Sequence, residues 1–175
     1  CEYTMQFQCS DGTFGSFAKS YLKCSAKPAT PVNIPCHFAG YMMGLAKVGM
    51  GNHKRLDKSW KLLQTWQRED GGWLNERHLT GEASPYKVWT RSCPWVTYFS
   101  CAAIKHSSSL ESKDSLRRGL TFLSNHLAAK EANNMCSFYY HGHETLKELL
   151  MFAEEGIAVK PNAMTQMMKW LMEMY

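Results

Sequence analysis

The chain has 175 residues, of which 45% are hydrophobic, and this length and composition suit one globular domain with a core and argue against disorder. The formal net charge is +5, but the Lys and Arg residues are scattered and form no dense basic stripe, so we expect no nucleic-acid partner. No apolar run reaches the roughly 18–20 residues that cross a bilayer, and no signal-peptide pattern is visible, so we expect no transmembrane segment and a cytoplasmic location.

The cysteines also limit the class of protein. There are seven of them, an odd number at irregular spacings, and no Cys-x-x-Cys pair occurs. Neither a secreted disulfide framework nor a simple zinc ribbon fits this pattern. We expect most of the cysteines to be thiols that act as small buried hydrophobic side chains.

The first feature along the chain is a turn that recurs. The segment from Gln8 to Phe14 and the segment from Gln67 to Trp73 share the pattern Gln-x-x-Asp-Gly-x-aromatic, and the second follows the first by 59 residues (67 − 8). Asp-Gly is a turn signal, and a glycine just after a helix can adopt the left-handed conformation that closes it. We therefore predict structural roles for Gln8, Asp11, Gly12, Gln67, Asp70, Gly71 and Trp73.

Helical patterns follow each turn. After a long loop, a cysteine opens a strongly apolar segment in each case, Cys36–Val48 and Cys93–Ile104, and helices that are apolar on most sides are buried. A more amphipathic helix then follows each buried one. The first of these ends at Trp66, and the second runs from Leu116 to Leu127 with leucines at helical spacing.

A third round begins near Cys136 and includes a break at Gly156 and a final methionine-rich helix that Pro161 opens. Strand signals are absent. The sequence therefore predicts an all-α fold in a single domain, 1–175, made of about three inner and outer helix pairs, with approximate repeats 8–66, 67–126 and 127–175.

The repeat resembles a known superfamily. The segment Lys58–Trp73 reads Lys-Ser-x-x-Leu-Leu-x-x-x-Gln-x-x-x-Gly-x-Trp and resembles the QW motif of the prenyltransferase and squalene-hopene cyclase-like repeat proteins. Arg118-Gly119-x-x-Phe122-Leu123 is similar to the front half of another copy, with Leu127 in place of the glutamine. The resemblance extends to small prokaryotic members of the group and implies an α/α toroid, here a partial ring.

The resemblance also implies a ligand. In such toroids the inner helices surround a cavity for an apolar, isoprenoid-type molecule, and aromatic residues are suited to line it. The candidate lining residues are Phe38, Tyr41, Trp95, Tyr98, Phe99, Tyr139 and Tyr140. The alternative is that these residues simply form the core. No Asp-x-Asp-Asp motif is present, so a terpene cyclase is less favoured than a prenyltransferase-like transferase, and whether the protein is an enzyme stays open.

A zinc ion is the candidate cofactor. Protein prenyltransferase β subunits hold zinc through an Asp and a Cys at one inner helix and a His at a later one, and Cys93 and His141 match two of these positions. Arg91 stands where the Asp is expected and cannot bind a metal. His143 or Glu144 could replace it, because imidazole and carboxylate groups are competent zinc ligands. The alternative is that Cys93 is a small buried residue.

Three helix pairs would leave an open arc with apolar edges. Leaving apolar surface wet costs about 25 cal/mol per Å². We therefore expect a homo-oligomer, or a second polypeptide that completes the ring. A different class of function stays open beside the ligand-binding one, in which the chain is a non-catalytic helical-repeat module for protein–protein interaction.

Overall fold

The computed structural model describes residues 2–14, 35–73, 92–107, 112–128 and 150–158, together with positions 161, 164, 165, 168, 169 and 172. Within these residues the chain is mostly helical and contains isolated β-bridges but no strand, so the predicted all-α class is confirmed. The α-helices are α1 (Glu2–Met5), α3 (Pro35–Leu45), α4 (Asp57–Thr65), α5 (Pro94–Lys105) and α6 (Ser112–Ala128), with two short helical turns, η1 (Ala46–Met50) and η2 (Lys54–Leu56). None of the described helices is both long and apolar enough to cross a membrane.

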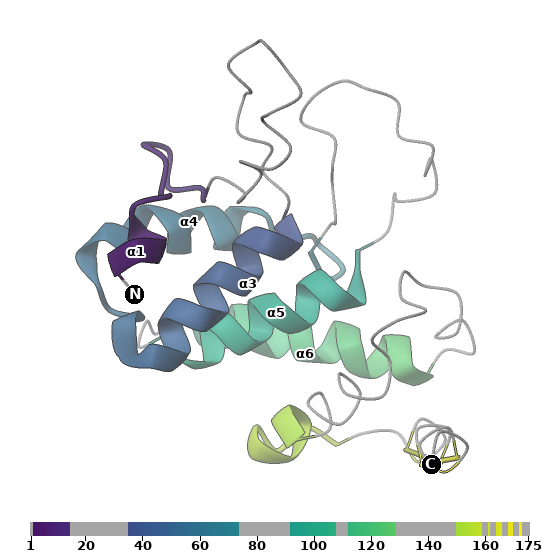
Figure 1. Cartoon of the computed structure of the whole chain (residues 1–175). Coiled ribbons are helices and arrows are strands. Elements are labelled where there is room, and N and C mark those ends of the chain that lie inside the picture. Colours follow the sequence, from purple (N-terminus) through teal and green to yellow (C-terminus); the bar gives the residue numbers. More distant parts are fainter. Residues whose placement is uncertain are drawn as a thin grey trace, which may run out of the picture.

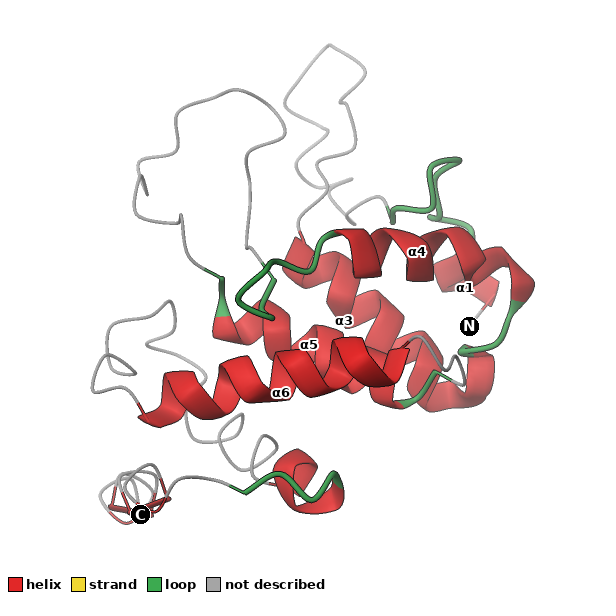
Figure 2. Cartoon of the chain, turned by 180° about the vertical axis from the view of Figure 1, so that it is seen from behind, coloured by secondary structure: helices red, strands yellow, loops and turns green. Residues whose placement is uncertain are grey.

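The helices form two layers. Figure 1 shows α3 and α5 side by side, and Figure 2, from behind, shows α4 and α6 on the opposite side. Helix α5 holds the layers together because it packs against both α3 and α6. At Gly119 of α6, an added Cβ would lie 2.4 Å from the Cys101 sulfur of α5, so only glycine permits this close approach.

Prolines begin the two helices of the α3 and α5 layer. The sequence pattern placed the cysteines Cys36 and Cys93 at the helix starts, but α3 begins at Pro35 and α5 at Pro94. Proline suits a first helical position because its missing N–H would have no partner there. The two prolines are 59 residues apart (94 − 35), the same spacing as the two glutamines, so the repeat keeps one register from the turn into the following helix.

Helix α3 ends through a wide turn. It continues into η1, where Val48 and Gly49 leave helical torsion angles and Gly49 has a φ of +83°. The chain then reaches Gly51, whose carbonyl accepts a 2.7 Å hydrogen bond from the indole N–H of Trp60. An added Cβ at Gly51 would meet the carbonyl of His106 at 2.8 Å, so the connector after α3 lies against the connector after α5.

The core lies between the layers. Its largest fully buried side chains include Trp73, Phe38, Phe152, Met5, Met42, Leu56, Leu63, Leu120 and Leu123. Each large apolar side chain that is fully buried contributes about 1.5–3 kcal/mol relative to exposure. These residues come from α1, α3, α4, α6, the second turn and the segment 150–158, so one continuous core joins all of these parts.

The segment 150–158 joins the core through apolar side chains and α5 through charged ones. Met151 and Phe152 are buried, and the Lys105 ammonium of α5 forms ion pairs with Glu154 and Glu155. Partial burial lowers the pKa of Lys105, but its hydrogen bonds to the two carboxylates outweigh burial and raise that pKa above its ordinary value. The predicted break at Gly156 is present, with a φ of +66° after the helical residues 150–154.

Candidate functional site

The second turn, Gln67–Trp73, is closed by its own backbone and by Asp70. The Arg68 N–H donates to the Gly72 carbonyl (2.9 Å), and the Asp70 carboxylate accepts from the Gly72 N–H (3.0 Å). Gly71 has a φ of +88°, a conformation that favours glycine. Asp70 and Gly71 therefore shape the turn by local chemistry.

This turn docks on α6. The Gln67 side-chain amide donates to the Ser115 carbonyl (2.8 Å), and its oxygen accepts from the Ser115 hydroxyl (2.8 Å) and from the Arg118 guanidinium (2.5 Å). An added Cβ at Gly71 would lie 2.5 Å from the Arg118 carbonyl oxygen. The turn that follows α4 is thus held by the next helix of the same layer.

The first turn, Gln8–Phe14, repeats this geometry on α4. The Gln8 amide donates to the Arg55 carbonyl (2.7 Å) and to the Ser59 hydroxyl (2.9 Å), which itself donates to the Gly12 carbonyl (2.5 Å). Gly12 has a φ of +92°, and its added Cβ would meet the Lys58 Cβ at 2.8 Å. The first turn is therefore held near the start of α4, and the second near the start of α6.

The Asp11 carboxylate has the same place in the first turn as Asp70 in the second. It accepts hydrogen bonds from the Thr13 hydroxyl (2.7 Å) and the Thr13 N–H (2.9 Å). The hydroxyl bond is the largest influence on Asp11, and together with the backbone bonds it outweighs partial burial and lowers the pKa of that carboxyl. An ionised Asp11 is therefore part of the folded turn.

Trp73 joins the second turn to three helices. Its indole N–H donates to the Leu63 carbonyl of α4 (2.7 Å), and its backbone N–H donates to the Thr97 hydroxyl of α5 (3.0 Å). On the α6 side, an added Cβ at Gly119 would lie 2.9 Å from the indole ring. The side chain is 1% exposed, so its role is packing.

Ser92 and Cys93 complete the joint between this turn and α5. Ser92 lies two positions before the first residue of α5, and its hydroxyl donates to the Asp70 carboxylate (2.7 Å). Cys93 takes the N-cap position, and its backbone N–H donates to the Trp73 carbonyl (2.7 Å). The start of α5 is thus fixed to the turn by side-chain and backbone bonds.

The candidate lining residues fall into two groups. Phe38 and Tyr98 are in the core, with Phe38 against Trp66 at a ring-centroid distance of 4.9 Å. Trp95 and Phe99 are partly exposed and lie edge to face on α5, with centroids 4.5 Å apart. Tyr41 is also partly exposed and contacts Phe14, and Tyr139 and Tyr140 lie outside the described residues.

The predicted metal ligands are not assembled in the described part of the chain. Cys93 is fully buried at the N-cap of α5, whereas His141, His143 and Glu144 lie outside the described residues. No group of three His, Cys, Asp or Glu side chains that could hold a metal ion occurs among the residues that the structure describes. Zinc therefore stays a prediction.

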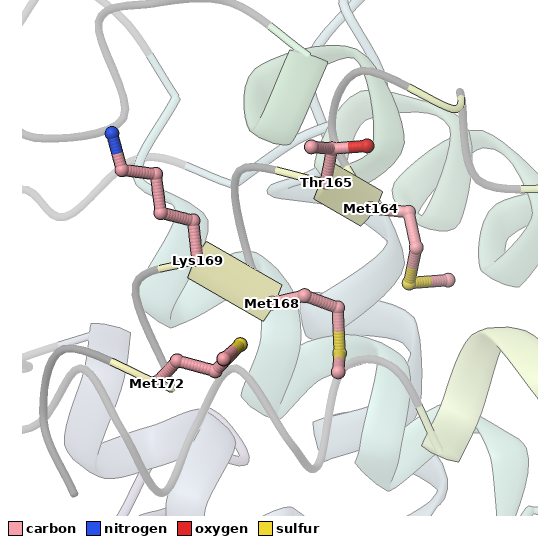
Figure 3. Close-up of a pocket in the computed structure, with 5 residues that line it drawn as sticks. All are labelled: Met164, Thr165, Met168, Lys169 and Met172. Carbon is pink, nitrogen blue, oxygen red and sulfur yellow. The ribbon is translucent and has the colours of Figure 1, made fainter.

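A shallow apolar hollow lies along the C-terminal helical positions. Met164, Met168 and Met172 recur every four residues and, with Thr165 and Lys169, line about 460 Å³ (Figure 3). Figure 3 shows Lys169 pointing away from Met164 and Met168. The three methionines are exposed, so this helix face is apolar and open to solvent.

Sequence reasoning missed the residues that receive the turns, namely Ser59, Ser115 and Thr97. The available signal was a polar residue on the apolar side of a helical pattern, because a buried hydroxyl needs a hydrogen-bond partner.

Comparisons of the chain with protein-family models, curated proteins and solved structures found no match. The function must therefore be argued from the geometry.

Proposed function

We propose that this protein binds an apolar, isoprenoid-like ligand on the side of α5 that carries Trp95 and Phe99. The observation behind this proposal is the exposure pattern of α5. Every residue from Val96 to Ile104 is buried except Phe99, which stands one helical turn from the partly exposed Trp95. The partly exposed sides of these two aromatic rings offer an apolar surface, and burying aromatic rings gives a large gain in free energy.

The neighbouring helix supports this choice of side. With a register of 59 residues, Gly40 of α3 corresponds to Phe99 of α5 (99 − 59). No heavy atom lies within 4 Å of an added Cβ at Gly40. The α3 position equivalent to Phe99 therefore has open space, which supports a ligand that lies across both helices.

The proposed architecture is the partial α/α toroid that the sequence resemblance implies, with α3 and α5 as inner helices and α4 and α6 as outer helices. The two layers and the constant register support it. In this architecture the Trp95 and Phe99 side would face the cavity, and a second copy or another polypeptide would complete the ring.

The binding proposal is tested with a fluorescent farnesyl analogue as the probe. We expect saturable binding, and we expect Trp95→Ala and Phe99→Ala each to raise Kd about tenfold, since losing about 1.4 kcal/mol of ring contact corresponds to that factor. Phe122→Ala is the matched control, because Phe122 is a partly exposed ring on α6 that stacks on His126 one turn away. Equal losses in all three variants would argue against a site on α5.

A prenyltransferase-like reaction would need an activated nucleophile, and zinc held by Cys93, His141 and either His143 or Glu144 would supply that activation by lowering the pKa of a bound thiol. Elemental analysis of the native protein tests this. We expect zinc at unit stoichiometry in the native chain and its loss in His141→Ala. Zinc that is absent, or that is retained in the variant, would contradict the assignment.

The second candidate function is a non-catalytic module for protein–protein interaction. It is favoured by the burial of Phe38 and Tyr98, which removes two rings from the proposed cavity lining. Native mass spectrometry separates the two functions. A co-purified lipid supports the ligand-binding proposal, whereas a co-purified polypeptide with no lipid supports the module.

A further inference from the structure

Methionines are concentrated near the end of the sequence. Of the 11 methionines in the chain, five lie within residues 164–174. In the predicted repeat this segment takes the place of the third outer helix, and the other two outer helices, α4 and α6, contain no methionine. Those two helices use mainly leucine at their apolar positions, so the repeat itself does not require methionine here.

Three of these methionines are not core side chains. Met164, Met168 and Met172 are 38%, 49% and 77% exposed. The part of an apolar side chain that stays in water gains no free energy from burial. Apolar bulk therefore does not explain methionine at these positions, and the sulfur atoms remain as the feature that distinguishes it from leucine.

The three side chains line a single hollow. They recur every four residues, so they lie on one side of the helical positions, with neighbours about 6 Å apart along the axis. Together with Thr165 and Lys169 they line about 460 Å³. A methionine side chain is unbranched and has three rotatable bonds, so neighbouring sulfur atoms can turn toward a point between them.

The other two lining residues leave the sulfur atoms as the ligands that can act together. The Thr165 hydroxyl donates to the Pro161 carbonyl (2.9 Å). Figure 3 shows Lys169 pointing away from Met164 and Met168, so its ammonium is not directed between these two side chains. None of the five lining residues carries a carboxylate or an imidazole, the groups that bind calcium, magnesium and zinc.

We propose that Met164, Met168 and Met172 bind a Cu(I) ion through their thioether sulfur atoms. Thioethers are soft ligands and select Cu(I), whereas oxygen ligands suit magnesium, calcium and manganese. A thioether has no proton to lose, unlike a thiol or an imidazolium, so this site binds equally well in neutral and mildly acidic solution. The site is separate from the ligand surface on α5 and does not depend on it.

The test is a titration of the full chain with Ag(I), a redox-inert ion of the same charge and similar softness, followed by NMR of methionines labelled with carbon-13 at the ε-methyl group. We expect the signals of Met164, Met168 and Met172 to shift together and to saturate, with the same Kd at pH 7 and pH 5. The methyl signals report on the thioethers themselves, so silver that binds cysteine thiols is not mistaken for this site.

Met168→Leu removes the central sulfur and keeps the apolar volume at an exposed position, so the fold should tolerate it. We expect Kd to rise at least about tenfold, because even changes around metal ligands typically cost that much. Met43→Leu makes the same change at a partly buried position of α3 and should leave the titration unaltered. Shifts spread evenly over all methionines, a Kd that rises at pH 5, or unchanged binding in Met168→Leu would overturn the proposal.

Discussion

The docking of the second turn on α6 can be measured by replacing Gly71 with alanine. The replacement has two costs. Gly71 has a φ of +88°, so an alanine there is strained, and its Cβ would lie 2.5 Å from the carbonyl oxygen and 2.9 Å from the carbonyl carbon of Arg118. Both of these atoms are backbone, so no side-chain rotation can relieve the contact.

The size of the effect follows from these two terms. A left-handed conformation costs a non-glycine residue about 1–2 kcal/mol. Forcing an extra methyl group into packed structure costs about 1–3 kcal/mol. Gly71→Ala should therefore lower the free energy of unfolding by roughly 2–5 kcal/mol, a large part of the ~5–15 kcal/mol that stabilises a typical domain.

Gly49→Ala is the matched control. Gly49 has nearly the same φ, +83°, but no heavy atom lies within 4 Å of its added Cβ. Gly49→Ala should therefore lower the free energy of unfolding only by the conformational cost, about 1–2 kcal/mol. Both changes reduce the entropy of the unfolded chain equally, so that contribution cancels in the comparison.

The assay is urea unfolding followed by circular dichroism at equilibrium. We expect Gly71→Ala to be less stable than Gly49→Ala by at least about 1 kcal/mol, because overpacking adds to the conformational strain. Equal losses in the two variants would refute the reasoning, since the turn would then have no close contact with α6.

Two further predictions follow from other contacts. Trp73→Phe keeps an aromatic ring but removes the donor to the buried Leu63 carbonyl, so we expect a loss of about 1–3 kcal/mol in the same urea assay, and an unchanged midpoint would contradict the hydrogen bond. The hydrogen bond from Lys105 lowers the pKa of Glu154, so the ion pair contributes fully above the ordinary pKa of a glutamate and is lost as the pH falls through the lowered one. Glu154→Gln should therefore flatten the dependence of the melting temperature on pH at the acid end, and an unaltered slope would count against the ion pair.

The turns were predictable from the sequence because their chemistry is local. An aspartate that accepts from the backbone N–H two residues later, followed by a glycine at positive φ, needs no information from the rest of the chain. Asp11 and Asp70 both make this bond, and Gly12 and Gly71 both have positive φ. Helix periodicity was equally informative, because it reflects the division of each helix into buried and exposed sides.

The partners of the turns were not predictable, because they come from the tertiary structure. Ser115 and Arg118 bind Gln67 from about fifty positions along the chain, and nothing near Gln67 specifies them. Ser92 shows the same limit. Its hydroxyl donates a hydrogen bond to the Asp70 carboxylate, 22 positions earlier in the chain.

The aromatic residues show why a candidate site is harder to predict than a fold. Cores and cavities use the same side chains, so composition cannot separate Tyr98 from its neighbour Phe99. Their positions on α5 separate them, because the side chains of adjacent helix residues point about 100° apart. Tyr98 is directed into the core, whereas Phe99 stays partly exposed beside Trp95.

The two layers are expected to have different roles, with the turn contacts of α4 and α6 stabilising the fold and α5 carrying the ligand surface. The two turns share a geometry that fixes α4 and α6 near their starts. Each joint includes a basic residue, with Lys58 donating to the Ser10 carbonyl and Arg118 donating to the Gln67 side-chain oxygen. Each of these joints involves neighbouring parts of the repeat only, so its energy is a nearest-neighbour term. A substitution in a turn should therefore change stability without altering the Trp95 and Phe99 surface, which lies on a different side of α5 from the Thr97 and Trp73 joint. The segment that carries the strongest sequence pattern is thus expected to be scaffold, and the ligand surface is expected on the side of α5 where that pattern has no contact.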